Sequence, residues 1–214
     1  MFNSTMNINI YVADSSHVIY ADAICELVYI SALERGTGIA KRSPEYIAQK
    51  MVSSKAVIAL DGKELAGFAY IETWSHSKFV ANSGLIIAHK YRNQGLAKKV
   101  KTKIFELSKK LYPNAKIFSI TTGLAIMKLN TQLGFKPVTF SELTDDKEFW
   151  KGCQGCRNFD VLQRNDYKMC LCTGLLYDPA EVPKSKFAPA LVSAGKTLII
   201  NPLVKINSII SSKK

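Results

Sequence analysis

Residues 83–111 read SGLIIAHKYRNQGLAKKVKTKIFELSKKL, and this stretch decides the fold of the chain. An apolar run ends in a polar loop that contains Gly95, and a helical pattern follows directly. From Leu96 the apolar residues recur at spacings of four, four, three and four, which predicts a helix with a single apolar stripe. The lysines of this helix are expected to lie largely off the stripe, namely Lys98, Lys99, Lys101, Lys103, Lys109 and Lys110.

A strand that turns sharply into a helix is suited to binding an anion. The first N–H groups of a helix have no acceptor within the helix, and they lie at the positive end of its dipole. Gly95 and the small Ala97 would let an anion approach this backbone closely. The alternative interpretation is an ordinary strand-to-helix turn followed by a solvated lysine face.

The same loop carries a family motif. Arg92-x-x-Gly95-x-Ala97 resembles the (Arg/Gln)-x-x-Gly-x-(Gly/Ala) signature of the GNAT acyl-CoA N-acyltransferases. Residues 133–135, Leu-Gly-Phe, resemble a helix end that the family places before its next strand. The resemblance implies a loop that binds the pyrophosphate of acetyl-CoA, or of another acyl-CoA such as succinyl-CoA, after a strand whose backbone binds the pantetheine arm. The implied cofactor-binding residues are Leu85, Ile86, Ile87, Arg92, Asn93, Gln94, Gly95, Leu96, Ala97 and Lys98.

The order of the expected elements agrees with this family. Periodicity and turn residues predict strands at 8–13, 56–60, 65–74, 85–87, 117–121, 135–140, 158–163 and 169–177, and helices at 17–33, 44–51, 96–111 and 124–133. The resemblance implies a mixed α/β fold, a strongly twisted mixed sheet with helices on both faces. We expect an acyltransferase domain over residues 1–178, including a cysteine-rich hairpin at 149–178, and a proline-punctuated basic and apolar tail at 179–214.

Charge and composition limit the partners. The chain has 214 residues and a net charge of +12, half of it from six lysines after Pro183, where no acidic residue follows. No nucleic-acid-binding motif accompanies this charge, so it favours solvation or attraction of coenzyme A over nucleic acid. No apolar run reaches the roughly 18 residues of a membrane span. A cytoplasmic protein without a membrane segment is expected, and the apolar tail favours packing against this subunit or a second one in a homodimer.

Acyl transfer to an amine needs a proton acceptor and help for the leaving thiolate. Glu72, near the end of an expected strand, is the candidate base, because the resemblance to the GNAT family implies a carboxylate at this position in many members. The alternative is a solvent-facing glutamate at a strand end. Asn130 occupies the position where many members have a tyrosine that protonates the thiolate. An amide cannot supply that proton but can donate a hydrogen bond to sulfur, so the thiolate leaves unassisted or another donor serves.

The connection between the first two helices is the candidate acceptor site. Arg35, Lys41 and Arg42 would hold the carboxylates of an acidic, small-molecule amine acceptor such as glutamate. The chain as a whole is similar to short acyltransferases of arginine biosynthesis, which make N-acylglutamate. The alternative interpretation of this loop is a flexible, soluble connection. The alternative for the enzyme is one that acetylates proteins.

Four of the five cysteines form two close pairs, Cys153-x-x-Cys156 and Cys170-x-Cys172. Two such pairs are typical of a tetrahedral zinc site, and four free thiols are the alternative interpretation. Because four thiolates leave no open coordination position, a zinc ion here would be structural. Together with the basic charge, these pairs also suggest a second class of function, a zinc-containing protein that binds nucleic acid.

Overall fold

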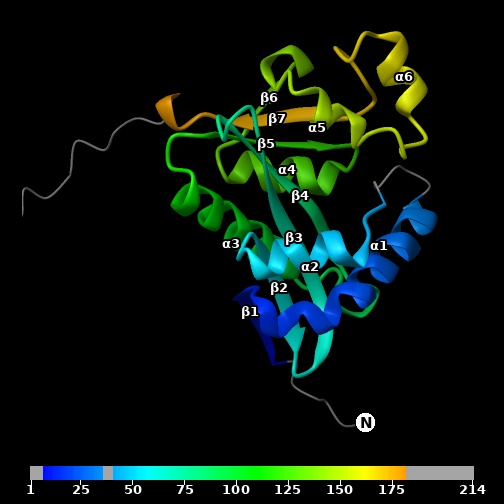
Figure 1. The fold of residues 1–214 in the computed structure, drawn as a ribbon, viewed down its shortest axis with the longest axis vertical. Coiled ribbons are helices and arrows are strands. Elements are labelled where there is room, and N and C mark those ends of the chain that lie inside the picture. The colour runs from blue at the N-terminus through cyan, green and yellow to red at the C-terminus, as the bar shows by residue number, and fades with distance from the viewer. Residues whose placement is uncertain (1–6, 36–40, 182–214) are drawn as a thin grey trace, which may run out of the picture. The chain divides into compact units, whose positions relative to one another are not determined.

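The computed structural model describes residues 7–35 and 41–181, and within these ranges seven strands form one mixed sheet (Figure 1). The strand order is β1-β2-β3-β4-β5-β7-β6. Neighbouring strands are antiparallel except for β4 and β5. The strands are β1 (Ile8–Val12), β2 (Ala56–Asp61), β3 (Glu64–Trp74), β4 (Phe79–Ile87), β5 (Lys116–Thr121), β6 (Lys136–Val138) and β7 (Thr173–Tyr177).

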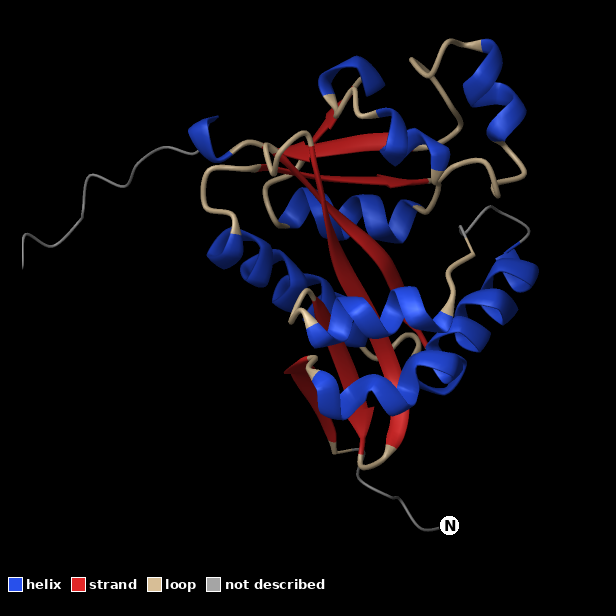
Figure 2. Ribbon diagram, in the orientation of Figure 1, coloured by secondary structure: helices blue, strands red, loops and turns tan. Residues whose placement is uncertain are grey.

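Helices cover both faces of this sheet (Figure 2). The α-helices are α1 (Ala21–Arg35), α2 (Pro44–Val52), α3 (Leu96–Leu111), α4 (Leu124–Gln132), α5 (Lys147–Lys151) and α6 (Phe159–Arg164). Four short 3-10 helices are η1 (Ser15–Tyr20), η2 (His89–Tyr91), η3 (Phe140–Glu142) and η4 (Pro179–Glu181). The mixed α/β fold with a GNAT-like sheet is therefore confirmed.

Alternate residues of each strand enter different cores, as the pleat requires. On β4, Val80 packs with α3 residues such as Val100 and Ile104. Its neighbour Ala81 packs on the other face with Phe149 of α5, and further along that face Ile86 packs with residues of α1 and α2. Helices α1, α2, α5 and α6 thus share one face of the sheet, and α3 covers the other.

The sheet opens between β4 and β5. The two strands pair only from Phe79 with Lys116 to Ala81 with Phe118. On its other side β4 stays paired with β3, but the register shifts between Ser83 and Ile86, opposite Phe68 and Tyr70. Gly84 and Leu85 therefore have no paired residue in either neighbouring strand, and this stretch of β4 presents backbone groups to the opening.

The cysteine-rich segment differs from the expected hairpin. The strand expected at 158–163 is helix α6, the strand expected at 169–177 begins only at Thr173, and α5 was not anticipated. Cys170 and Cys172 consequently precede β7 and do not share a strand face. A short apolar run does not distinguish a helix from a strand, which explains the error.

Several expectations involve residues outside the described ranges. Residues 182–214 of the expected tail lie there, as do residues 36–40 and the side chain of Arg35. Among the described residues, the helical stretch Ser15–Glu34 is long and apolar enough to cross a membrane by length and composition alone, which core helices also satisfy. Ala21, Ile24 and Val28 of this stretch are buried against the sheet.

Candidate active site

The loop between β4 and α3 has the geometry of an anion site. Asn93 and Gly95 have left-handed backbones, with φ of +62° and +77°, and Gly95 is the N-cap of α3. Within the described part of the chain, the N–H groups of Leu96, Ala97 and Lys98 find no acceptor. A Cβ added to Gly95 would meet no atom within 4 Å, so the space in front of these donors is open.

Arg92 has a structural role in this loop. Its Nε donates to the carbonyl oxygen of Ile87 at 3.0 Å, and its terminal nitrogens reach α1, at 2.8 Å from Glu34 Oε2 and 3.0 Å from Ser31 Oγ. The guanidinium thus ties the end of β4 to α1. An anion in the loop would be held by backbone N–H groups and not by this side chain.

The open stretch of β4 contacts Tyr70 of β3. Gly84 has φ of +63°, and a Cβ there would lie 2.2 Å from the Tyr70 ring, so only glycine fits. The Tyr70 hydroxyl accepts a hydrogen bond from Arg42 Nε at 3.0 Å. Tyr70 therefore connects β4 to the segment before α2.

Glu72 lies two residues after Tyr70, on the same face of β3. It is 6% exposed, and its carboxylate makes no hydrogen bond within the described residues. Burial raises the pKa of Glu72, and the nearby positive charge of Arg42 opposes this only in part. A carboxyl group with a raised pKa can act as a proton acceptor near neutral pH, and Glu72 lies on the strand next to the unpaired stretch of β4.

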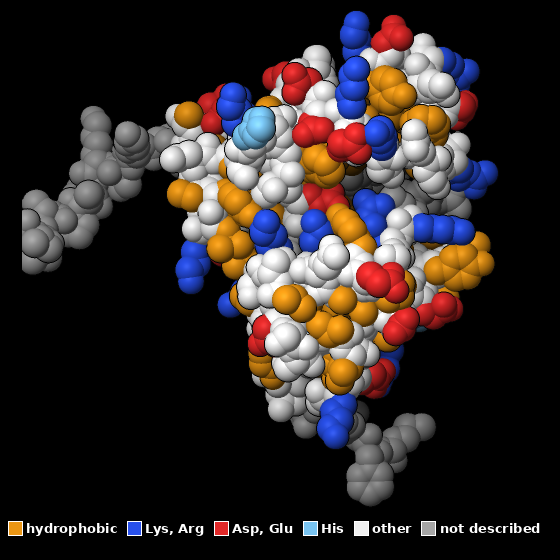
Figure 3. Space-filling model, in the orientation of Figure 1, with side chains coloured by type: hydrophobic (Ala, Val, Ile, Leu, Met, Phe, Trp, Pro, Cys, Tyr) orange, Lys and Arg blue, Asp and Glu red, His pale blue; other side chains and the backbone are white. Residues whose placement is uncertain are grey.

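Arg42, whose charge acts on Glu72, lies close to a second cation, Lys50. Lys50 Nζ lies 4.7 Å from the Tyr46 ring centroid and 5.9 Å from that of Tyr70, and the Arg42 guanidinium carbon lies 5.5 Å from Tyr46. Burial, together with the charges of Lys55 and Arg42, lowers the pKa of Lys50 to about 8. Figure 3 shows Lys and Arg side chains across the middle of this face, between the halves formed by α1–α2 and α5–α6.

The structure therefore brings one of the three predicted acceptor residues to Glu72. Arg42 lies there, whereas Lys41 Nζ lies 5.7 Å from the Tyr29 ring on α1, and Arg35 has no described side chain. Lys50 and Tyr70 were missed. The i, i+4 spacing of Tyr46 and Lys50 shows that these two residues share a face of α2. It does not show that this face of α2 packs against β3, which carries Tyr70.

Asn130 is the buried residue of α4, at 0% exposure. Neither polar atom of its side chain has a hydrogen-bond partner in the described part of the chain. A buried, unpaired amide is rare because it loses its hydrogen bonds to water without replacement. Contact between Asn130 and a bound thioester would require the surrounding packing to open.

A buried lysine lies on the other face of the sheet. Lys101 of α3 is 2% exposed, in contrast to its expected place off the apolar stripe. Its Nζ donates to Asn82 Oδ1 at 3.3 Å and lies 5.1 Å from the Phe135 ring centroid, and Asn82 in turn donates to Ser108 Oγ at 2.8 Å. Burial lowers the pKa of Lys101 to about 7. Asn82 directly follows the last β4–β5 pair, so this network lies where the strands part.

The four clustered cysteines lie in a separate pocket. None is in a disulfide, and all are partly buried. Burial, with a smaller effect of the neighbouring cysteines, raises the pKa of Cys153 to about 11 and that of Cys172 to about 12. Free thiols at Cys153 and Cys172 are therefore neutral at physiological pH.

Comparison with known proteins agrees with this geometry. Residues 39–135 match the model of the acetyltransferase (GNAT) family. No match was found among curated protein sequences. An N-acetylglutamate synthase from Neisseria gonorrhoeae, complexed with coenzyme A and N-acetyl-glutamate, superposes with a TM-score of 0.57 at 16% identity, over 80% of this chain and 35% of that one. This chain thus spans about a third of that relative.

Two shorter proteins are covered almost completely. A putative acetyltransferase from Salmonella typhimurium, solved with acetyl-CoA, gives a TM-score of 0.56 at 12% identity, over 83% of this chain and 96% of that one. A diaminobutyrate acetyltransferase from Paenibacillus lautus, complexed with L-2,4-diaminobutyric acid and coenzyme A, gives 0.55 at 11% identity, over 81% and 96%. The glycine loop at the start of α3 and the parted strands β4 and β5 agree with this match, so the chain has the fold of these acetyltransferases and resembles the GNAT family over residues 39–135.

Proposed function

We propose that this protein transfers an acetyl group from acetyl-CoA to the amine of a small acceptor that carries a carboxylate. The observation that carries the proposal is the position of Glu72, a buried carboxyl group with a raised pKa on the strand next to β4 and within the influence of the Arg42 charge. The pyrophosphate would bind the unpaired N–H groups of the β4–α3 loop. The pantetheine arm would run along the free edge of β4, where the sheet opens.

The reaction would be a direct attack in a ternary complex. Glu72, directly or through a water, takes a proton from the acceptor ammonium, and the free amine attacks the thioester carbonyl carbon. A backbone N–H of the open β4 stretch stabilises the oxyanion. The C–S bond then breaks, the attacking nitrogen gives its second proton to solvent, and the thiolate takes a proton from solvent, since Asn130 has no proton to give.

The acceptor side favours an amino acid. Arg42 and Lys50 are two cations next to each other, and Arg42 can bind a carboxylate through two parallel hydrogen bonds. Glutamate fits this cluster with a second carboxylate, and two of the similar solved structures contain N-acetyl-glutamate and 2,4-diaminobutyric acid. A lysine side chain in a protein would instead bring a cation toward two cations.

The test is a thiol-release assay across acceptors and donors. Glutamate, 2,4-diaminobutyrate and a lysine peptide are each offered with acetyl-CoA and with succinyl-CoA. We expect turnover with an acidic amino acid and a rise in its KM of about tenfold to hundredfold in Arg42→Ala or Lys50→Ala, because each removes a charge-assisted contact worth about 1.5–3 kcal/mol.

The matched control is Lys63→Ala, an exposed lysine in the β2–β3 turn, which should leave KM unchanged. Turnover of the lysine peptide in preference to every amino acid would overturn the acceptor assignment. Absence of thiol release and of thermal stabilisation with both acyl-CoAs would overturn the proposed activity itself.

A further inference from the structure

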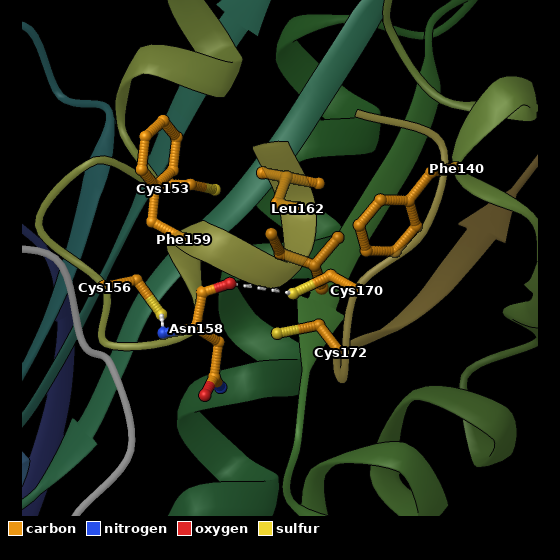
Figure 4. A pocket seen from close by; sticks show the side chains of 9 residues that line it. Phe140, Cys153, Cys156, Asn158, Phe159, Leu162, Cys170 and Cys172 are labelled. Carbon is orange, nitrogen blue, oxygen red and sulfur yellow. Dashed lines mark hydrogen bonds between the residues drawn. The ribbon is translucent and has the colours of Figure 1, made fainter. Parts of the chain in front are cut away.

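Four cysteines line one small apolar pocket beside the start of β7 (Figure 4). Cys153 and Cys156 follow α5, whereas Cys170 and Cys172 precede β7, so the two pairs come from opposite ends of the segment 152–172. The cavity measures about 20 Å³. That space accommodates one water-sized ligand and excludes an organic cofactor. The other lining residues are Ile120, Phe140, Asn158, Phe159 and Leu162.

The backbone of Asn158 connects the two pairs. Its N–H donates to Cys156 Sγ at 3.4 Å, and its carbonyl oxygen accepts a weak hydrogen bond from Cys170 Sγ at 3.8 Å. In Figure 4 the sulfur atoms of Cys170 and Cys172 point toward the side of the pocket from which Cys156 comes. A backbone N–H directed at a sulfur stabilises negative charge there, which suits a thiolate ligand.

The segment between the pairs has little else to hold it. Its one helix, α6, has six residues, of which Leu162 is buried. Beyond this helix Met169 and Leu171 are 59% and 65% exposed. No residue from 152 to 172 belongs to a strand of the described sheet. Small irregular segments with so little core are commonly stabilised by a disulfide or a structural metal.

We propose that Cys153, Cys156, Cys170 and Cys172 bind one structural Zn²⁺ ion. The described residues contain no group of three potential ligands already arranged around a metal, so these side chains must turn inward as the ion binds. Each thiol gives its proton to solvent, and four sulfurs complete a tetrahedral site with Zn–S distances of about 2.3 Å. The coordination is then closed, and the ion has no part in acyl transfer.

The surroundings favour a metal over disulfides. Disulfide formation requires an oxidant, whereas the metal requires only the four donors that the pocket brings together.

The Zn²⁺–thiolate complex carries two net negative charges, and Arg42 lies nearby. Its terminal nitrogen is 3.7 Å from the position of a Cβ added to Gly152, next to Cys153. The site would therefore also fix the surface against which Arg42 of the acceptor site packs.

The experiment measures metal on the purified full-length chain produced with Zn²⁺ in the medium. We expect about one zinc per chain by mass spectrometry of metals. After exchange, Co²⁺ alone should give the sulfur-to-cobalt absorption bands of a tetrahedral thiolate site. Cys153→Ser and Cys170→Ser should each lose bound zinc and lower the thermal midpoint. Cys25→Ser is the matched control, because Cys25 lies in α1 and packs against a different hydrophobic core. This variant should keep the zinc ion.

Wild-type protein without stoichiometric zinc would overturn the proposal, and this result does not depend on whether any variant folds. Iron in place of zinc, or alkylation showing that the four thiols are paired in disulfides in the protein as isolated, would also overturn it. Because the measurement reads metal and not turnover, its failure leaves the acyltransferase proposal untouched.

Discussion

At the scale of single residues, Glu72 combines a cost in stability with the catalytic role proposed for it. Its folded pKa is raised, so the unfolded chain loses this proton first as the pH rises. The folded state then binds more protons, and stability falls as the pH passes from the unfolded to the folded pKa. A proton acceptor, by contrast, works only above its pKa.

Glu72→Gln should therefore lower kcat by about 10²- to 10⁴-fold and remove the acidic limb of the pH–rate profile. It should also raise the free energy of unfolding at neutral pH, because the buried charge is gone. Steady-state kinetics across pH, with urea denaturation, check both. Glu64→Gln, on the exposed start of β3, is the control. A variant that keeps both kcat and the acidic limb would exclude Glu72 as the base.

Lys101 gives a pH dependence of opposite sign. Its folded pKa of about 7 lies below the ordinary value of 10.5, so between these values the unfolded chain holds the proton that the folded chain lacks. This residue should make stability rise with pH across that window, by up to about 1.4 kcal/mol per pH unit. Lys101→Met should remove that slope.

Urea denaturation of wild type and variant at several pH values between 7 and 9 measures the difference in slope. Lys103→Met, an exposed lysine of the same helix, should keep the wild-type slope. Equal slopes in wild type and Lys101→Met would show that Lys101 remains charged in the folded protein.

At the scale of elements, the β4–α3 loop combines a backbone requirement with an open space. Gly95 and Gly62 share the left-handed backbone, with φ of +77° and +61°, and neither has an atom within 4 Å of an added Cβ. Alanine at either position should cost about 1–2 kcal/mol of backbone strain. Only at Gly95 should a larger side chain also exclude the cofactor.

We expect acetyl-CoA to raise the thermal midpoint of wild type, Gly62→Ala and Gly95→Ala, and to have no effect on Gly95→Glu. The acidic side chain occupies the space in front of the loop and repels the pyrophosphate. Thermal denaturation with and without acetyl-CoA measures this. An undiminished shift in Gly95→Glu would place the pyrophosphate elsewhere.

Elements with strong local patterns were predicted from the sequence. Helix α2 begins at Pro44, where the sequence predicted a helix start, and the hydroxyl of Ser43 accepts a hydrogen bond from the backbone N–H of Tyr46. Helix α3 begins directly after Gly95. In contrast, α6 was taken for a strand, because six residues without a distinctive period do not determine their own structure.

At the scale of the whole molecule, the sequence alone predicted the mixed α/β fold and the resemblance to the GNAT acetyltransferases that the family match supports. The loop motif, the helix caps and the strand periods depend on backbone geometry within a few residues, which local sequence specifies. Tertiary structure alone decided how Arg42, Tyr70 and Glu72 meet, why Lys101 is buried and how four cysteines reach one pocket. These features depend on packing between segments far apart in the chain, and no local pattern encodes which faces will touch.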